Sequence, residues 1–486
     1  MKKAIALAMT LMACVAFRVL AQRSGPNAKA VVDAALKAMG TSSLQSIQYS
    51  GTGSIYSTGQ AYLSGGAWPR YTLKKYTMSV NYTVPAMRQE IVRVDDEKPP
   101  RGGGAGGYNP VTFQGGIRPV PGDIIQNQNI DARTEPGALD LWLSPHGFLK
   151  GAAANLSAAK TTTSRGKTTL SFTSGKYTVT GILNSQNLVE EVDLLRDVAY
   201  TGDTPIDAVY SNYRDFGGVK FPMHVVIKES GYTTLYLMVA TVSPNSIPAL
   251  EVRGAEAAAG RGGTPARPEP ASEKIGEGVW FLTPGIEGSV LVEFNDYVVM
   301  LEAPGNDAYS MAAIAKAKNM LPNKPIRYVV NSHHHSDHAG GLRAYVAQGI
   351  PIITYESHKK YYEDQIFRNP HTINPDILPR APKKPVIETV SDKRVITDGK
   401  MTLEIYLMKD QLHADGLLMF YIPKEKLLIQ ADTYAPRPGA PPLASPSPLT
   451  VNLVDNVSRL KLDVQRVAHI HGGINPYSDV LASAGR

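Results

Sequence analysis

Residues 331–341 hold the densest group of metal-binding side chains in the sequence. They read Asn-Ser-His-His-His-Ser-Asp-His-Ala-Gly-Gly, and imidazole and carboxylate groups are ligands that first-row metal ions accept. Side chains alternate in an extended loop, so His333, His335 and Asp337 can point to one side. A turn into a following helix would bring His338 beside them. One loop could therefore supply ligands to two adjacent ions, whereas an accidental histidine cluster would not explain the aspartate at this spacing.

The segments on either side predict how this loop is held. Residues 326–330 are short, β-branched and apolar, as expected of a strand that is covered on both faces. Gly340 and Gly341 then allow a close backbone approach, and Leu342, Tyr345 and Val346 begin the apolar face of a helix. The sequence thus predicts a strand, a ligand loop and a helix in direct succession.

This arrangement, with the pattern His-x-His-x-Asp-His in the loop, resembles the metallo-β-lactamase-fold hydrolases. The resemblance implies an α/β domain, an αββα sandwich, over residues 273–486. Strands expected at 278–282, 289–294 and 297–301 and a helix at 308–320 agree with the first half of that fold. The resemblance extends to about Ser478.

Three further ligands are implied by the resemblance. His413 is similar to the family's third histidine, although Leu412 replaces the usual preceding glycine. Asp432 ends a strand, as the bridging aspartate of glyoxalase-like members does. His471 precedes Gly472 and matches the last ligand better than His469, which lies two residues earlier. The implied metal ligands are His333, His335 and His413 for one ion and Asp337, His338 and His471 for the other, with Asp432 bridging both.

Such a ligand set implies two zinc ions, with iron or manganese as other ions that it accepts. Two ions about 3.5–4 Å apart activate a bridging hydroxide, which can cleave an ester, lactone, thioester or amide bond, β-lactams included. Asp337 would be the catalytic residue that orients this hydroxide. Tyr434 and Arg437, in the proline-rich loop after Asp432, are candidate substrate-binding residues.

Two other functions are compatible with parts of the pattern. A single iron held by His333, His335 and His413 would resemble a persulfide dioxygenase. Alternatively, the metal could be structural in a binding module for an apolar ligand, but structural zinc sites need only four ligands. The family's cysteine-dependent β-lactamases are excluded because Cys14 is the only cysteine.

The amino-terminal half predicts a separate domain. Residues 1–21 have the charged and apolar parts of a signal peptide, which predicts export to the periplasm or the medium. Cys14 lies in a segment that resembles a lipoprotein box and could instead carry a lipid anchor.

Residues 24–252 predict a mostly antiparallel β domain that begins with a helix ending at Gly40, and residues 213–227 weakly resemble the half-barrels of lipoprotein carriers. Residues 253–272 are rich in Gly, Ala and Pro and predict a linker.

The composition and charge of the chain exclude some classes of binding partner. The 486 residues carry a formal net charge of +7 without a Lys/Arg-rich run, so nucleic-acid binding is not expected. No membrane-spanning segment is predicted, which leaves a small-molecule substrate as the expected partner. We interpret His146 and His224 as structural residues. We interpret His334, His358 and His371 as residues that lie behind the ligands or at the surface.

Overall fold

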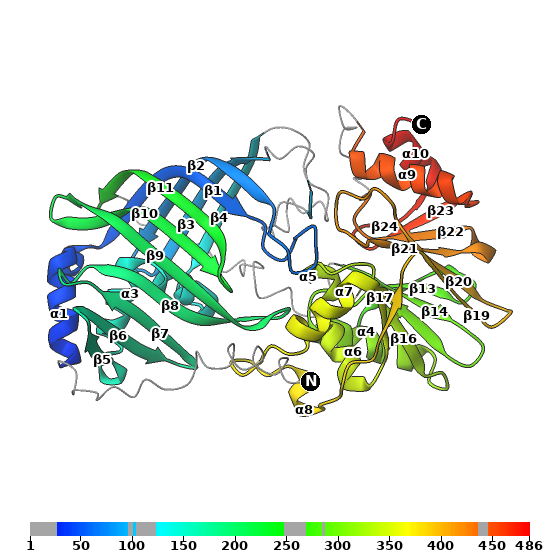
Figure 1. Cartoon of the computed structure of the whole chain (residues 1–486), viewed down its shortest axis with the longest axis horizontal. Helices are drawn as coiled ribbons and strands as arrows, with labels where there is room; N and C mark the ends of the chain where they lie inside the picture. Colours follow the sequence, from blue (N-terminus) through cyan, green and yellow to red (C-terminus); the bar gives the residue numbers. More distant parts are fainter. Residues whose placement is uncertain (1–26, 96–100, 104–122, 247–268, 284–286, 436–445) are drawn as a thin grey trace, which may run out of the picture.

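The computed structural model describes residues 27–95, 101–103, 123–246, 269–283, 287–435 and 446–486. Within these ranges the chain forms a β-rich first domain and an α/β second domain, which lie side by side (Figure 1). The predicted signal peptide, the alternative lipid anchor at Cys14 and most of the predicted linker lie outside the described residues.

In the described part of the first domain, one antiparallel sheet of 11 strands has the order β4-β3-β2-β1-β11-β10-β9-β8-β7-β6-β5. The strands are β1 Ser46–Tyr56, β2 Arg70–Asn81, β3 Ala86–Val94, β4 Asp123–Asp131, β5 Lys160–Ser164, β6 Lys167–Ser174, β7 Tyr177–Leu183, β8 Val189–Val198, β9 Gly202–Phe216, β10 Val219–Glu229 and β11 Tyr232–Pro244. The large antiparallel sheet predicted from the sequence is confirmed.

Three helices pack on this sheet and fill its core: α1 Ala28–Met39, α2 Glu135–Trp142 and α3 Pro145–Ala154, with short 3-10 turns at Thr41–Ser43 and Leu156–Ala158. Helix α1 ends where the sequence predicted, because Gly40 adopts φ 68° and its N–H closes the last turn. Gly181 in β7 faces the ring of Phe148 in α3, and a Cβ there would lie 2.4 Å from the ring. The helices therefore rest directly on the sheet.

The alternating apolar pattern continues past the end of one strand. Apolar side chains alternate from Tyr76 to Val84, but β2 ends at Asn81. The Asn81 side chain accepts hydrogen bonds from the N–H groups of Thr83 and Val84 and forms the turn into β3. Side-chain-to-backbone bonding of this kind ends a strand regardless of the apolar pattern.

The second domain contains two sheets in its described residues. The first has the order β12-β13-β14-β15-β16-β17-β18 and is parallel from β15 onward, and the second has the order β19 to β24. The strands are β12 Ala271–Gly276, β13 Val279–Thr283, β14 Ser289–Glu293, β15 Val298–Leu301, β16 Ile326–Val330, β17 Ile352–Tyr355, β18 Ile387–Val390, β19 Lys393–Thr397, β20 Thr402–Leu407, β21 Leu418–Ile422, β22 Leu427–Gln430, β23 Arg466–His469 and β24 Gly473–Pro476.

Buried side chains of both sheets share one core, to which α9 Pro448–Leu460 and α10 Tyr477–Ser483 also contribute. A separate core joins the first sheet to α4 Asp307–Met320 and α6 Leu342–Gln348. The remaining helical segments are α5 Ser336–Ala339, α7 Glu356–Tyr361, a π turn at Tyr362–Ile366, α8 Ile377–Arg380 and a 3-10 turn at Pro423–Glu425. Among the described residues, none of the helices combines the length and apolar character needed to cross a bilayer.

The two domains are joined by hydrogen bonds around the turn between β8 and β9. Asp203 accepts from the N–H groups of Thr372 and Ile373 and from the Thr372 hydroxyl. Tyr200 is buried in the helix-facing core of the second domain and donates its hydroxyl to the carbonyl of His334. This turn of the first domain is therefore anchored in the second.

Asp203→Ala is expected to destabilise the protein by about 1–2 kcal/mol at neutral pH, because it leaves those donors without their acceptor. Burial acts against ionisation of Asp203, but the hydrogen bonds from Thr372 and Ile373 outweigh it and hold its pKa below the ordinary value. Because the pKa of Asp203 is lower in the folded state than in the unfolded state, its carboxylate stabilises the fold fully at pH values above the unfolded pKa of about 3.9. This stabilisation is lost as the pH falls further. Urea unfolding of both proteins should show a difference that shrinks toward about pH 3. A difference independent of pH would contradict this assignment.

Candidate metal centre

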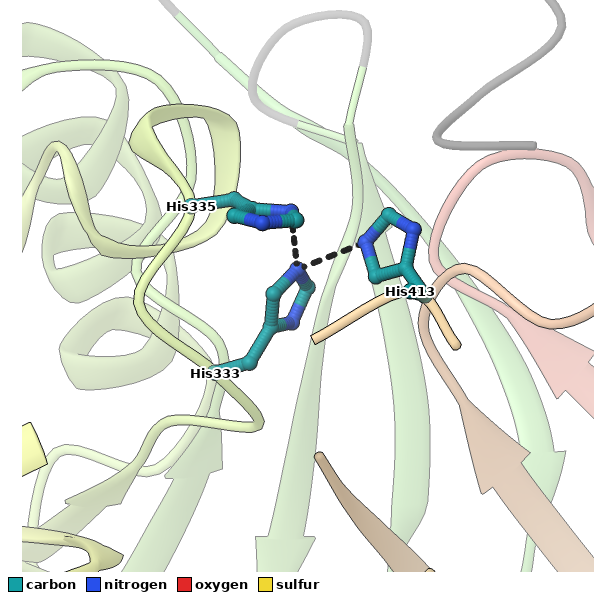
Figure 2. A group of neighbouring side chains, drawn as sticks. All are labelled: His333, His335 and His413. Atoms are coloured by element: carbon teal, nitrogen blue, oxygen red, sulfur yellow. Dashed lines mark hydrogen bonds between the residues drawn. The ribbon is translucent and has the colours of Figure 1, made fainter. Parts of the chain in front are cut away.

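The first group of candidate ligands consists of three buried histidines. His333 and His335 lie on the loop that follows β16, and His413 lies on the loop between β20 and β21. Figure 2 shows the three rings converging, with His333 Nε2 at 3.0 Å from His335 Nδ1 and 3.1 Å from His413 Nε2. The ligand atoms of all three lie within 4.8 Å of one another, as one metal ion would require.

The second group lies beside the first and consists of Asp337, His338, Asp432 and His471. Helix α5 begins at Ser336 and turns the chain, so His338 Nε2 comes within 2.8 Å of His471 Nε2. Asp337 Oδ2 lies 3.5 Å from each of these two nitrogens. The turn expected after the ligand loop is present.

Asp432 occupies the position between the two groups. Its Oδ2 lies 2.7 Å from His338 Nε2 in the second group, and 3.3 Å from His333 Nε2 in the first. Its Oδ1 lies 3.0 Å from His471 Nε2. One carboxylate thus faces nitrogens of both groups, as a ligand shared by two ions would.

The charges of these side chains fit cation binding. Burial lowers the pKa of His333 well below its ordinary value and that of His335 to about 3, so both are neutral, the form that binds a metal. Burial also opposes charge on His338, but Asp432 and Asp337 outweigh it and raise its pKa well above the ordinary value. The carboxylates of Asp337 and Asp432 thus stabilise positive charge in the second group. A metal cation bound there would supply that charge.

Groups behind the histidines fix which ring nitrogen faces the centre. Ser332 Oγ lies 2.8 Å from His333 Nδ1, and the carbonyl of Ala61 accepts from His335 Nε2 at 2.8 Å. The Glu302 carboxylate lies 3.4 Å from His338 Nδ1. Partners of this kind set the tautomer and orientation of a metal-binding imidazole.

Glu302 contacts the candidate ligand loop and was not predicted from the sequence. It follows β15, is fully buried, and accepts hydrogen bonds from Ser332 N and Asn331 Nδ2 at 3.1 and 3.4 Å. Its φ of 72° lies in the left-handed region, which non-glycine residues rarely adopt. An acidic residue directly after an apolar strand was the signal that could have revealed it.

Glu302→Ala is expected to lower the free energy of unfolding by roughly 2 kcal/mol or more, because buried donors of the ligand loop lose their acceptor. The matched control is Glu388→Ala, which removes a partly exposed ion pair with Arg394 and should cost less than about 1 kcal/mol. Urea unfolding of the two variants measures the difference. Equal effects would show that Glu302 does not brace the loop.

The other sequence candidates occupy different positions. His469, the alternative to His471, lies outside both groups, and its Nδ1 contacts Gln430 Nε2 at 2.6 Å. Tyr434 packs against the His469 ring with centroids 4.9 Å apart, and Arg437 lies outside the described residues. Their predicted role in substrate binding stays a prediction.

The histidines interpreted as structural or surface residues are mostly buried. His334 is held between the Ala61 carbonyl and His358, and His358 also contacts the carbonyl of Asp415. His146 lies in the first-domain core between Thr41 and Lys220. None of the three belongs to a candidate ligand group among the described residues.

One protein-family model matches part of the second domain. The sequence profile described as "Metallo-beta-lactamase superfamily" matches residues 282–466. No protein in a curated set matches the chain.

Several solved structures are similar to this chain. The metallo-beta-lactamase from Pontibacter korlensis is 17% identical, with a TM-score of 0.35, and the match covers 45% of this chain and 98% of that chain. The metallo-beta-lactamase from Hirschia baltica is 22% identical, with a TM-score of 0.34, and the match covers 45% of this chain and 97% of that chain.

Proposed function

Residues 282–466 belong to the metallo-beta-lactamase superfamily, and from this premise we propose that the protein is an exported, binuclear zinc hydrolase. The family assignment is consistent with a metal-dependent hydrolase in general. The observation that carries the more specific proposal is the position of Asp432, whose carboxylate faces nitrogens of both ligand groups. We also infer that the helices and sheets of the second domain form the αββα sandwich of this superfamily.

Two ions held by these groups would supply a strongly acidified water and a positive centre for the oxygen that gains charge during attack. The residues of the chain prepare that chemistry. Asp337 Oδ2 faces the centre beside His338 and His471 and can accept a hydrogen bond from the attacking water. Full burial of His333, His335 and His413 keeps bulk water away from the ligands themselves.

The ligand set also weighs against the two alternative functions. A persulfide dioxygenase would use one iron, but Asp337, His338 and His471 form a second complete group beside the first. A structural site closed by four ligands would not need seven candidate ligands. The second group therefore favours the binuclear hydrolase.

The bond that is cleaved is an ester, lactone, thioester or amide in a small molecule. The test is hydrolysis of a substrate panel with these four bonds, β-lactams included, by protein reconstituted with zinc. Turnover of at least one class that disappears with a chelator is expected. No turnover of any class by a fully zinc-loaded protein would contradict the proposal.

Export is part of the proposal and has its own test. Removal of residues 1–21 would leave a mature chain beginning at Gln22, whereas lipidation would leave a chain beginning at Cys14. Mass determination of the protein from a secreting host distinguishes the two. A full-length cytoplasmic product would contradict export.

A further inference from the structure

The loop between β1 and β2, residues 57–69 of the first domain, lies directly over the candidate ligand loops of the second domain. Figure 1 shows this loop reaching toward α5. Gly59 O accepts from Ser336 N at 3.3 Å, and Tyr62 O accepts from Asp415 N at 2.8 Å. Between them, Ala61 O accepts from both His334 and His335. The contacts thus involve consecutive residues of the loop rather than one chance encounter.

Gln60 makes the contact closest to the proposed chemistry. Its side chain is buried, and Nε2 donates to Asp337 Oδ1 at 2.9 Å. The other carboxylate oxygen, Oδ2, is the one that lies 3.5 Å from His338 Nε2 and His471 Nε2. Gln60 therefore holds one oxygen of Asp337 and leaves the other directed at the second ligand group.

A second segment of the first domain keeps the Gln60 amide in place. Gly103 N donates to Gln60 O at 2.9 Å, and Gly102 N donates to Leu412 O, beside His413. A Cβ on Gly103 would lie 1.8 Å from Gln60 Oε1 and 2.8 Å from His335 Cε1. The backbone at Gly103 therefore packs against Gln60 so closely that only glycine fits.

The chemistry of the two side chains fixes the direction of this hydrogen bond. An ionised carboxylate only accepts, so the amide nitrogen of Gln60 must face Asp337. The amide oxygen then faces the Gly103 backbone, as the close approach there shows. Gln60 consequently cannot rotate away without losing the contacts on both of its sides.

We propose that Gln60 is a positioning residue for Asp337, so that the metal centre is completed by the first domain. This inference rests on the proposed binuclear function. It adds a role for the β-rich domain, which supplies the donor that orients one ligand of the second ion. Outer partners of metal ligands change metal affinity or activity by about 10–100-fold.

The test is a zinc titration of the full-length apoprotein, which measures the affinity of the first and the second equivalent separately. Gln60→Leu keeps the size of the side chain but removes the donor, and Gln60→Asn keeps the amide but shortens its reach. Both should weaken the second equivalent by about 10–100-fold and leave the first unchanged. The matched control, Ser64→Ala, removes another hydrogen bond between the same loop and the second domain, from Ser64 Oγ to Ser357 O.

Ser64→Ala should bind both equivalents as the wild type does. If both Gln60 variants bind the second equivalent with wild-type affinity, or if both equivalents weaken equally, the positioning role is overturned while the binuclear centre stands. If the wild type binds fewer than two equivalents, the proposed function itself fails, and the inference fails with it. The titration thus separates the two claims.

Discussion

Asp337→Ala is expected to abolish hydrolysis while leaving the fold intact. The substitution removes a candidate ligand of the second group together with the oxygen that would face the attacking water. The loss in kcat/KM should therefore exceed the about 10–100-fold loss that is typical when only an outer partner of a ligand is removed. Steady-state kinetics with the best substrate of the panel measures it, and circular dichroism checks the fold.

The matched control for this variant is Asp392→Ala. Asp392 is exposed, and its carboxylate forms an ion pair with Lys409, whereas its backbone carbonyl, which the substitution keeps, accepts a hydrogen bond from Leu407 N. Its replacement should leave kcat/KM unchanged, because exposed ion pairs contribute little. An Asp337→Ala enzyme that retained the activity of this control would refute the role assigned to Asp337.

Removal of metal is expected to have the second largest effect, on activity and stability together. Five of the seven candidate ligands are buried in the second domain, so ions held there would bind the folded chain in preference to the unfolded one. A free metal-ion concentration of about 1,000 times Kd would stabilise the folded protein by about 4 kcal/mol. Treatment with a chelator should therefore abolish turnover and lower the melting temperature, and added zinc should restore both.

Magnesium serves as the control ion in that experiment, because it prefers oxygen ligands in octahedral geometry. It should restore neither activity nor melting temperature to a site built from five histidines and two aspartates. A chelated protein shown to be free of metal that kept its activity would contradict any role for these ions in catalysis.

The family resemblance implied the candidate ligands, and four of them also follow a short apolar strand. His333 and His335 follow β16, Asp432 follows β22, and His471 follows β23. The ends of β22 and β23 are neighbours in one sheet, whereas β16 belongs to the other sheet, and the packing of the two sheets brings these residues together. His471 lies in the second candidate group, whereas the His469 ring contacts Gln430 instead, and the choice of His471 over His469 as a ligand stays a prediction.

The contribution of the first domain could not be predicted in this way. Gln60 lies in a loop between two strands and is separated from Asp337 by 277 positions. No periodicity or spacing marks a glutamine in such a loop as a partner of a metal ligand. Its role depends on how the domains pack, which local patterns do not encode. Glu302 does follow an apolar strand, but its hydrogen bonds to Asn331 and Ser332, 29 and 30 positions away, are visible only in three dimensions.

The proposed function depends on two ions that share the candidate ligands gathered around Asp432. Elemental analysis of the purified mature protein counts zinc, iron and manganese per chain. We expect about two zinc ions per chain, one for each ligand group. A content of one iron per chain, or no bound metal after zinc reconstitution, would contradict the proposed function.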